Sequence, residues 1–538
     1  MTNELWGWPR RVGVAFASIL AVATLLWAAP LASQGVHELR TQAENSGFTA
    51  FTAYDSMMTY LADLQAGSTE MRLGIYGETH LGRELPFAIF SRPAVTQPWE
   101  AWALGKPILV LAAGVHGPER TLRESVLIMT RDFATPGTPM NDLLDDLTVL
   151  VVPQINPDGF SNQPNPQRGN LWGLDLNRDY MKMEQPEIQG YLQNVILRWA
   201  PHLYIDGHNG GSYPYNINYQ CPSHAAPDQR ISRLCDEEIF PAIDRKLATE
   251  DYLSFYYSGG NQEAWRVGGT EPRIGRNYGG FANTVAILFE SPGRQSMADG
   301  VRSGVLAYEA VVEWSRDNPE LLMNTVHEAR RETIALGSEP RGTVALETRY
   351  EPEDFPVTYL ITQGQGADQE VVTVENGVLL KKPVATLERD RPWAYVLPRD
   401  AEAAVELLQR HSIQVERLLR PTQVTVQAYT IGNVTYAPVY NHSATTRVHV
   451  EDVITREMTL PIGSYIVRTG QMQGRVAAHL LEAESTDGVV YWNRMDAWIP
   501  KREVDRFKAG EGEAPQFPIV KIMTPTPLAT RLLPGGGD

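Results

Sequence analysis

The stretch Pro107-Ile-Leu-Val-Leu-Ala-Ala-Gly-Val-His-Gly-Pro-Glu119 decides the fold of this chain, because it joins an apolar strand to two side chains of types that can bind a metal. Residues 107–113 are rich in branched apolar side chains, which is typical of a buried parallel strand. His116 and Glu119 follow directly, three positions apart. At the carboxyl end of a strand they can bind zinc if a third ligand arrives from elsewhere. The predicted third ligand is His208, which ends another apolar run.

The same spacing occurs a second time, in Val476-Ala-Ala-His-Leu-Leu-Glu-Ala483. No apolar strand and no Gly-rich turn lead into His479 and Glu482. The pattern there is that of an ordinary amphipathic helix. The spacing alone therefore does not predict a metal site, and the surroundings of His116 have to supply the rest.

Those surroundings contain further pieces of a catalytic site, in a fixed order. The apolar strand 147–153 is followed by Asn156-Pro-Asp-Gly159, then Arg168, then Asp175-Leu-Asn-Arg178. After His208 comes another apolar strand, 284–290, which ends in Glu290. In this order the pieces resemble the zinc carboxypeptidase family (the M14 metallopeptidases), over about residues 50 to 315.

The resemblance implies one zinc ion per chain, with His116, Glu119 and His208 as its protein ligands. Three protein ligands leave a position for a water whose pKa falls to about 7 when bound. Glu290 becomes the general base that takes a proton from this water and passes it to the leaving amine. Asp175 would orient His116 through its other ring nitrogen. A strand-end charge held in a salt bridge is the alternative for Glu290, although a buried carboxylate is costly unless it is paired.

The resemblance also implies how a peptide is held. Arg168 would polarise the scissile carbonyl, and Asn177 with Arg178 would grip the terminal carboxylate of the substrate. A guanidinium matches such oxygens with two parallel donors, which a lysine cannot do. Arg168 lies in a loop rich in Pro, Asn, Gln and Gly, so a solvated loop residue is the alternative reading.

Two further roles are left open by the sequence. Asp206 shares a strand face with His208, so it either orients that ligand or is only a polar strand residue. In the family a mobile Tyr upstream of the catalytic Glu covers the bound substrate. Tyr256, Tyr257 and Tyr278 are candidates for this role, and the sequence does not choose among them.

Two arginines and two cysteines lie in the same part of the chain. Arg273 and Arg276 favour an acidic terminal side chain in the substrate if they line its pocket; otherwise they are surface residues of a polar loop. Cys221 and Cys235 are the only cysteines, so the fold is not a disulfide scaffold. An oxidising compartment would permit a bridge between them, and zinc binding by them is not expected.

The amino terminus predicts export. A basic start with Arg10 and Arg11 precedes an apolar stretch, residues 12–29, and then small residues. This is typical of a secretory signal, and an uncleaved membrane anchor is the alternative. We expect a periplasmic or secreted protein whose only membrane contact is such an anchor. The net charge of −17 and the pI near 5.2 argue against a nucleic-acid partner.

Strands and helices alternate through the first 315 residues, which predicts an α/β fold with a mainly parallel sheet covered by helices on both faces. The resemblance implies a mixed eight-stranded sheet. From about residue 340 short β-rich segments appear, with one helical segment at 401–410. We therefore predict a signal or anchor at 1–35, a catalytic domain at 36–335, a smaller β-rich α+β accessory domain at 340–530 and a disordered tail at 531–538.

Three functions compete on this reading. The first is a zinc carboxypeptidase that releases C-terminal residues from peptides, with trimming of peptidoglycan peptides as one version of it. The second is an N-acyl amino acid deacylase of the aspartoacylase type, which shares the fold and the His-x-x-Glu. Such deacylases are usually compact and cytosolic, whereas this chain has a predicted export signal and the segment Asn156-Pro-Asp-Gly159. The third is a binding module without catalysis, which would be expected to have lost a zinc ligand or Glu290.

Overall fold

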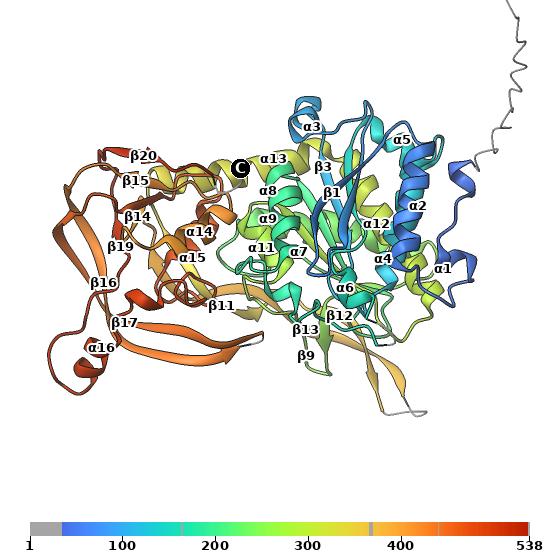
Figure 1. The fold of residues 1–538 in the computed structure, drawn as a ribbon. Helices are drawn as coiled ribbons and strands as arrows, with labels where there is room; N and C mark the ends of the chain where they lie inside the picture. Colours follow the sequence, from blue (N-terminus) through green and yellow to red (C-terminus); the bar gives the residue numbers. More distant parts are fainter. Residues whose placement is uncertain (1–34, 163–164, 365–368, 440, 536–538) are drawn as a thin grey trace, which may run out of the picture.

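The computed structural model describes residues 35–162, 165–364, 369–439 and 441–535 (Figure 1). All but the last residue of the predicted signal or anchor at 1–35 lies outside this part. Among the described residues, no helix has both the length and the apolar character needed to span a bilayer. Figure 1 shows two regions side by side, one blue to yellow-green and one orange to red.

The first region is built on the predicted eight-stranded sheet. The strand order is β1 (Met71–Glu78), β2 (Glu84–Phe90), β4 (Thr148–Val152), β3 (Ile108–Ala113), β5 (Leu203–His208), β10 (Val285–Glu290), β6 (Ile217–Gln220) and β7 (Ser254–Tyr256). The four central strands β4, β3, β5 and β10 pair in parallel. Antiparallel pairs join β1 to β2, β2 to β4, and β10 to β6. The predicted mixed sheet is confirmed.

Helices cover both faces of this sheet because its central strands are apolar on both sides. Along β3, Leu109 and Leu111 pack with α2 (Tyr54–Gly67), α4 (Thr121–Ala134), α10 (Phe240–Ala248) and α12 (Met297–Asp317). The alternate residues Val110 and Ala112 pack with α7 (Pro186–Tyr191) and α11 (Gly275–Phe281) on the opposite face. This alternation is the two-residue period of a strand buried between two layers.

The second region is rich in β-structure, as predicted. A seven-stranded sheet has the order β17 (His442–Leu460), β16 (Thr422–Val439), β19 (Val520–Ile522), β14 (Ala394–Leu397), β18 (Tyr465–Arg468), β15 (Glu416–Leu418) and β20 (Thr530–Leu532). In its described part it is accompanied by the α-helices α14 (Glu402–Arg410), α15 (Gly474–Leu481) and α16 (Lys501–Lys508). The predicted tail is wrong in its first residues, because Arg531 and Leu532 pair with β15. Residues 536–538 lie outside the described part.

A further sheet links the two regions. Its order is β11 (Thr343–Pro352), β13 (Glu370–Asp390), β9 (Ala264–Val267) and β8 (Ser258–Gly260), and β12 (Val357–Gln363) also pairs with β13. Strands β8 and β9 come from the predicted catalytic domain, and Leu379 of β13 pairs with Trp265 of β9. Helix α13 (Pro319–Ser338) extends past the predicted boundary at 335. Backbone pairing therefore crosses the boundary that the sequence predicts between the two domains.

Candidate active site

The site is assembled by the carboxyl ends of three neighbouring parallel strands. β5 lies between β3 and β10, and the register pairs Glu290 with His208 at the last position of both strands. His116 and Glu119 follow β3 in the turn before α4. Because the ends of parallel strands meet at one edge of a sheet, residues from three distant parts of the sequence come together there.

His116, Glu119 and His208 form a compact cluster. Nδ1 of His116 lies 2.8 Å from Oε1 of Glu119, and Nδ1 of His208 lies 2.8 Å from Oε2 of the same carboxylate. The two Nδ1 atoms are 3.2 Å apart. One ligand atom from each residue lies within 4.8 Å of the others; both histidines are buried, and the side chain of Glu119 is only 11% exposed. Two imidazoles and a carboxylate that converge in this way fit the donor set of a zinc site with an open position.

Two carboxylates set the direction of the imidazoles. Nε2 of His116 donates to Oδ1 of Asp175 at 2.9 Å, and Nε2 of His208 lies 2.9 Å from Oδ2 of Asp206. Both Nδ1 atoms consequently face the cluster. Burial opposes the charge of Asp175, but the hydrogen bond from His116 holds the pKa of this carboxyl below its usual range. Of the two readings of Asp206, the contact with His208 favours the orienting one.

Glu290 closes β10 beside this cluster. Burial raises its pKa to about 7, the negative charge of Glu119 adds to this rise, and His208 and His116 oppose it. The approach of Gly210 to Glu290 is so close that a Cβ at position 210 would lie 2.5 Å from Oε2. A glycine at this position therefore leaves the room that the carboxylate occupies. The surroundings of Glu290 are the residues of the site itself, which disfavours the reading as an unrelated strand-end ion pair.

Arg168 is anchored in the site. Its Nη1 donates to Glu119 at 2.8 Å and its Nε donates to Asp175 at 3.0 Å. The side chain is 44% exposed, so part of it is open to a ligand. These contacts disfavour the reading of Arg168 as a solvated loop residue.

Asn177 and Arg178 lie in a short turn, η3 (Leu176–Arg178), which Asp175 caps. The buried amide of Asn177 is engaged within the protein, since its Oδ1 accepts from Gly275 N at 2.8 Å. Arg178 donates from Nη1 to Asn177 O at 2.9 Å and is half-buried. The sequence did not foresee that Asn177 also holds the segment that begins α11.

The structure distinguishes the three candidate tyrosines. The hydroxyl of Tyr278 is buried against His411, and that of Tyr256 donates to Asp236. The pKa of Tyr257 is raised mainly by burial, and also by the charge of Glu290. Tyr257 is therefore the candidate whose phenol lies within electrostatic range of the site.

The two arginines of this segment differ as well. Arg273 is paired with Asp487, and its guanidinium lies over the ring of Trp492 at 5.6 Å, so the C-terminal region occupies it. Arg276 is buried and donates to Gly269 O at 2.5 Å, and its charge opposes the rise in the pKa of Tyr257. Only Arg276 therefore stays a candidate for contact with a substrate side chain.

The structure shows two contacts near the site that the sequence left open or did not predict. Cys221 and Cys235 form a disulfide, which ties the end of β6 to the helix pair that begins with α9 (Gln229–Leu234). The backbone N–H of Asn209 donates to Oε2 of Glu119 at 3.1 Å. Its position directly after a predicted ligand was the only sequence signal for this contact.

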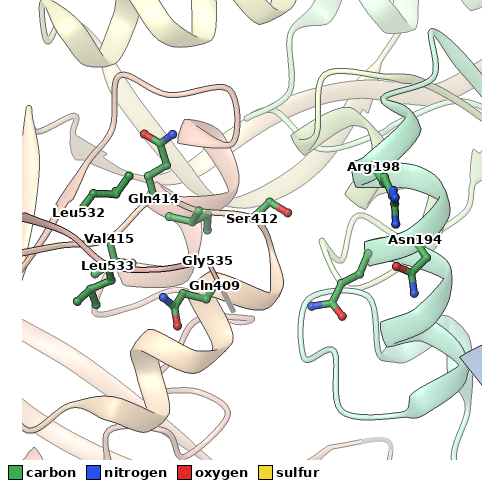
Figure 2. A pocket seen from close by; sticks show the side chains of 11 residues that line it. Asn194, Arg198, Gln409, Ser412, Gln414, Val415, Leu532, Leu533 and Gly535 are labelled. Atoms are coloured by element: carbon green, nitrogen blue, oxygen red, sulfur yellow. The ribbon is translucent and has the colours of Figure 1, made fainter. Parts of the chain in front are cut away.

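A cavity of about 660 Å³ lies elsewhere, between the two regions. Figure 2 shows Asn194 and Arg198 on one side of it and Gln409, Ser412 and Gln414 on the other. None of the residues that line it belongs to the cluster around Glu119. The cavity and the candidate active site are therefore separate.

Known proteins resemble this chain in sequence. Residues 57–270 match the family model described as zinc carboxypeptidase, Peptidase_M14. Carboxypeptidase 2 of Trichophyton equinum is 23% identical over 465 residues, which cover 82% of this chain and 83% of that protein. Human carboxypeptidase D is 25% identical over 176 residues, covering 27% of this chain and 12% of that protein.

Among solved structures, the metallo-carboxypeptidase of Pseudomonas aeruginosa aligns with a TM-score of 0.38 at 20% identity, over 49% of this chain and 68% of that one. Carboxypeptidase A of Helicoverpa armigera aligns with a TM-score of 0.39 at 15% identity, over 52% and 74%. Residues 57–270 therefore carry a zinc carboxypeptidase domain of the M14 family, and most of the chain aligns with proteins named carboxypeptidases, which supports a metallopeptidase.

Proposed function

We propose that the protein removes single C-terminal residues from peptides at the cluster of His116, Glu119 and His208. The observation that carries this proposal is the convergence of three metal-binding side chains with Glu290 and Arg168 at one edge of the sheet. A site for one metal ion, a general base and an exposed cation are the parts that metal-dependent peptide hydrolysis needs.

His116, Glu119 and His208 would hold one zinc ion per chain. When bound, zinc supplies a Lewis acid that makes water a stronger acid and polarises a carbonyl. The protein contributes the orientation of the ligands, because Asp175 and Asp206 each hold the outer nitrogen of one imidazole. Orientation by such carboxylates typically contributes about 10- to 100-fold to metal affinity or activity.

Glu290 is the proposed proton carrier. It accepts a proton from the attacking water at its carboxylate and returns it to the leaving amine. A general base works best when its pKa lies near the working pH, and burial raises the pKa of Glu290 to about 7. Tyr257 is the proposed aromatic cover for the bound peptide.

Two arginines, the exposed Arg168 and the half-buried Arg178, divide the recognition of the peptide. Arg168, beside Glu119, is placed to hold the carbonyl oxygen of the scissile bond as charge develops on it. Arg178, three residues after Asp175, would pair with the terminal carboxylate, with Asn177 beside it. A terminal carboxylate held there would limit cleavage to the last peptide bond. Arg276 then favours an acidic side chain at that last residue.

The two alternatives are less well supported. A deacylase would act on free N-acyl amino acids, and the relatives that align along most of the chain are named carboxypeptidases. A hydrolase of peptidoglycan peptides would use the same chemistry on a particular peptide. The disulfide agrees with the proposed export to an oxidising compartment.

The test is a set of peptides of varied C-terminal residue, each as the free acid and as the amide, assayed with and without a chelator. We expect the free acids to be cleaved, the amides to be cleaved poorly, and the chelator to stop both reactions. Arg178→Ala should lower kcat/KM on free acids by about 10- to 100-fold, the usual range for a charged hydrogen bond, and change the amides little. Equal wild-type rates on acid and amide would contradict the proposed clamp and indicate an endopeptidase.

A further inference from the structure

Asp487 belongs to the C-terminal region but is buried against the catalytic region. Its side chain is fully buried, and Oδ2 accepts a hydrogen bond from the backbone N–H of Arg273 at 3.0 Å. Oδ1 lies 3.4 Å from Nη1 of Arg273. A buried carboxylate is costly unless a cation and hydrogen bonds compensate for lost water. Here those partners come from the other region of the chain.

A series of hydrogen bonds leads from this contact towards the cluster of His116, Glu119 and His208. Two residues after Arg273, the N–H of Gly275 donates to Oδ1 of Asn177 at 2.8 Å. The N–H of Asn177 donates to Oδ1 of Asp175 at 2.8 Å, and the same oxygen accepts from His116 Nε2 at 2.9 Å. The links are hydrogen bonds between largely buried groups, and two peptide bonds join Arg273 to Gly275, so the contact with Asp487 is connected to the cluster without a gap.

Gly275 shows how closely this segment approaches the site. A Cβ there would lie 2.9 Å from the ring of Tyr180 and 3.1 Å from Oδ2 of Asp206. The segment that Asp487 holds therefore lies directly against the carboxylate that contacts His208.

The C-terminal region holds the loop after Asp175 at further points. Nδ2 of Asn441 donates to Asp175 O at 3.2 Å, and Arg494 Nη2 donates to Glu184 at 2.7 Å. Nζ of Lys182 lies 5.1 Å from the ring centre of Trp492. Figure 1 shows the long hairpin of β16 and β17 running from the C-terminal region towards the catalytic region.

We propose that the C-terminal region completes the peptidase site, with Asp487 as a positioning residue that holds residues 273–275 and, through Asn177, the turn that carries Arg178. The region then acts on substrate binding without touching the metal. This inference rests on the proposed function, because it assigns the loop at 175–178 to the terminal carboxylate. It predicts that binding of a peptide acid depends on a residue more than 300 positions away along the chain.

The test uses the full chain with Glu290→Gln, so that peptides bind without being cleaved. Calorimetry then gives the Kd of one peptide as free acid and as amide, with and without Asp487→Asn. At pH 8, above the pKa of about 7 to which burial raises Asp487, the substitution keeps the shape and removes the charge that faces Arg273. We expect the Kd of the acid to rise about tenfold, the loss of one charge-assisted contact, and that of the amide to change less than about twofold.

A matched control separates positioning from general damage to the region. Glu482 is equally buried, pairs with Lys521 at 2.9 Å and has no link to residues 273–275 among the described contacts. Glu482→Gln should leave the ratio of the two Kd values unchanged in protein whose circular dichroism shows it folded. Should Asp487→Asn not fold, Asn441→Gly replaces it, because glycine keeps the positive φ of 63° and removes the contact with Asp175.

A second readout does not depend on peptides. The release of zinc to a chelator should be roughly threefold faster in Asp487→Asn than in wild type, because the series of hydrogen bonds ends at His116. Unchanged Kd and zinc release in Asp487→Asn would overturn the inference, and so would equal changes in Glu482→Gln. If wild type cleaves no peptide acid but zinc release still changes, the proposed function fails and the positioning role of Asp487 stands.

Discussion

The chain contains His-x-x-Glu twice, and the two copies have different structures. At His116 both ring nitrogens face carboxylates, and Glu119 lies between two imidazoles. At His479 the ring lies in α15, 5.0 Å from Phe281, and no carboxylate pairs with it among the described residues. Glu482 pairs instead with Lys521 and accepts hydrogen bonds from Tyr395 and Tyr429.

The difference shows what turns a spacing into a metal site. His479 lies on α15, where residues three apart share a face, whereas His116 and Glu119 lie in the turn before α4. Only the copy that follows β3 has a neighbouring parallel strand to supply His208. Convergence of strand ends, rather than the motif, assembles the donor set.

The largest expected effect concerns the two histidines. His116→Ala should abolish zinc binding and turnover, because a donor set of three loses a ligand. His479→Ala should keep a full equivalent of zinc and lose only stability, about 2–5 kcal/mol for a large buried side chain. Metal analysis and thermal unfolding of both variants measure this. A zinc-free but folded His479→Ala protein would mean that zinc binding depends on the second copy.

The next effect concerns the carboxylate at the end of β10. Glu290→Gln keeps the shape of the side chain and removes the proton acceptor, so kcat should fall by about 10²- to 10⁴-fold. Zinc should be retained, since Glu290 is not one of the three clustered ligands. Near-normal turnover in a zinc-loaded Glu290→Gln protein would show that another group takes the proton.

The parts that could be predicted from the sequence share one property, which is that the signal is local. The apolar runs that became β3, β4, β5 and β10 were readable, and so were the polar residues that end them. Asp175 could be placed through the motif that contains it. Each of these depends on the alternation of a buried strand or on a short turn.

The parts that could not be predicted depend on contacts between distant segments. Tyr257 could not be chosen over Tyr256 from the sequence. The direction of the two rings depends on how strands β7, β8 and β9 are placed, and β9 pairs with β13, which lies more than 100 residues later. The alternatives for Arg273 were equally open until Asp487 was found beside it. Nothing in the local pattern at 273 refers to residue 487, so only the folded chain shows the pair.

The smallest expected effect compares two buried glutamates. Glu482 has a lysine and two tyrosines as partners, whereas burial raises the pKa of Glu290 from 4.5 to about 7. In zinc-free protein the folded state then holds a proton that the unfolded state has lost between these two pH values. Stability from this group is therefore full below about pH 4.5 and is lost as the pH rises through 7, by roughly 3 kcal/mol.

Glu290→Gln lacks this titration, so the variant should gain free energy of unfolding relative to wild type as the pH rises from 5 to 8. Asp179 and Asp487, whose pKa is also raised to about 7 by burial, titrate in both proteins and cancel in the difference. Denaturant unfolding of both chelator-treated proteins across this range measures it. A difference that stays constant with pH would show that Glu290 is already ionised in the folded protein at pH 5, and that the solvent or a neighbouring cation compensates its charge.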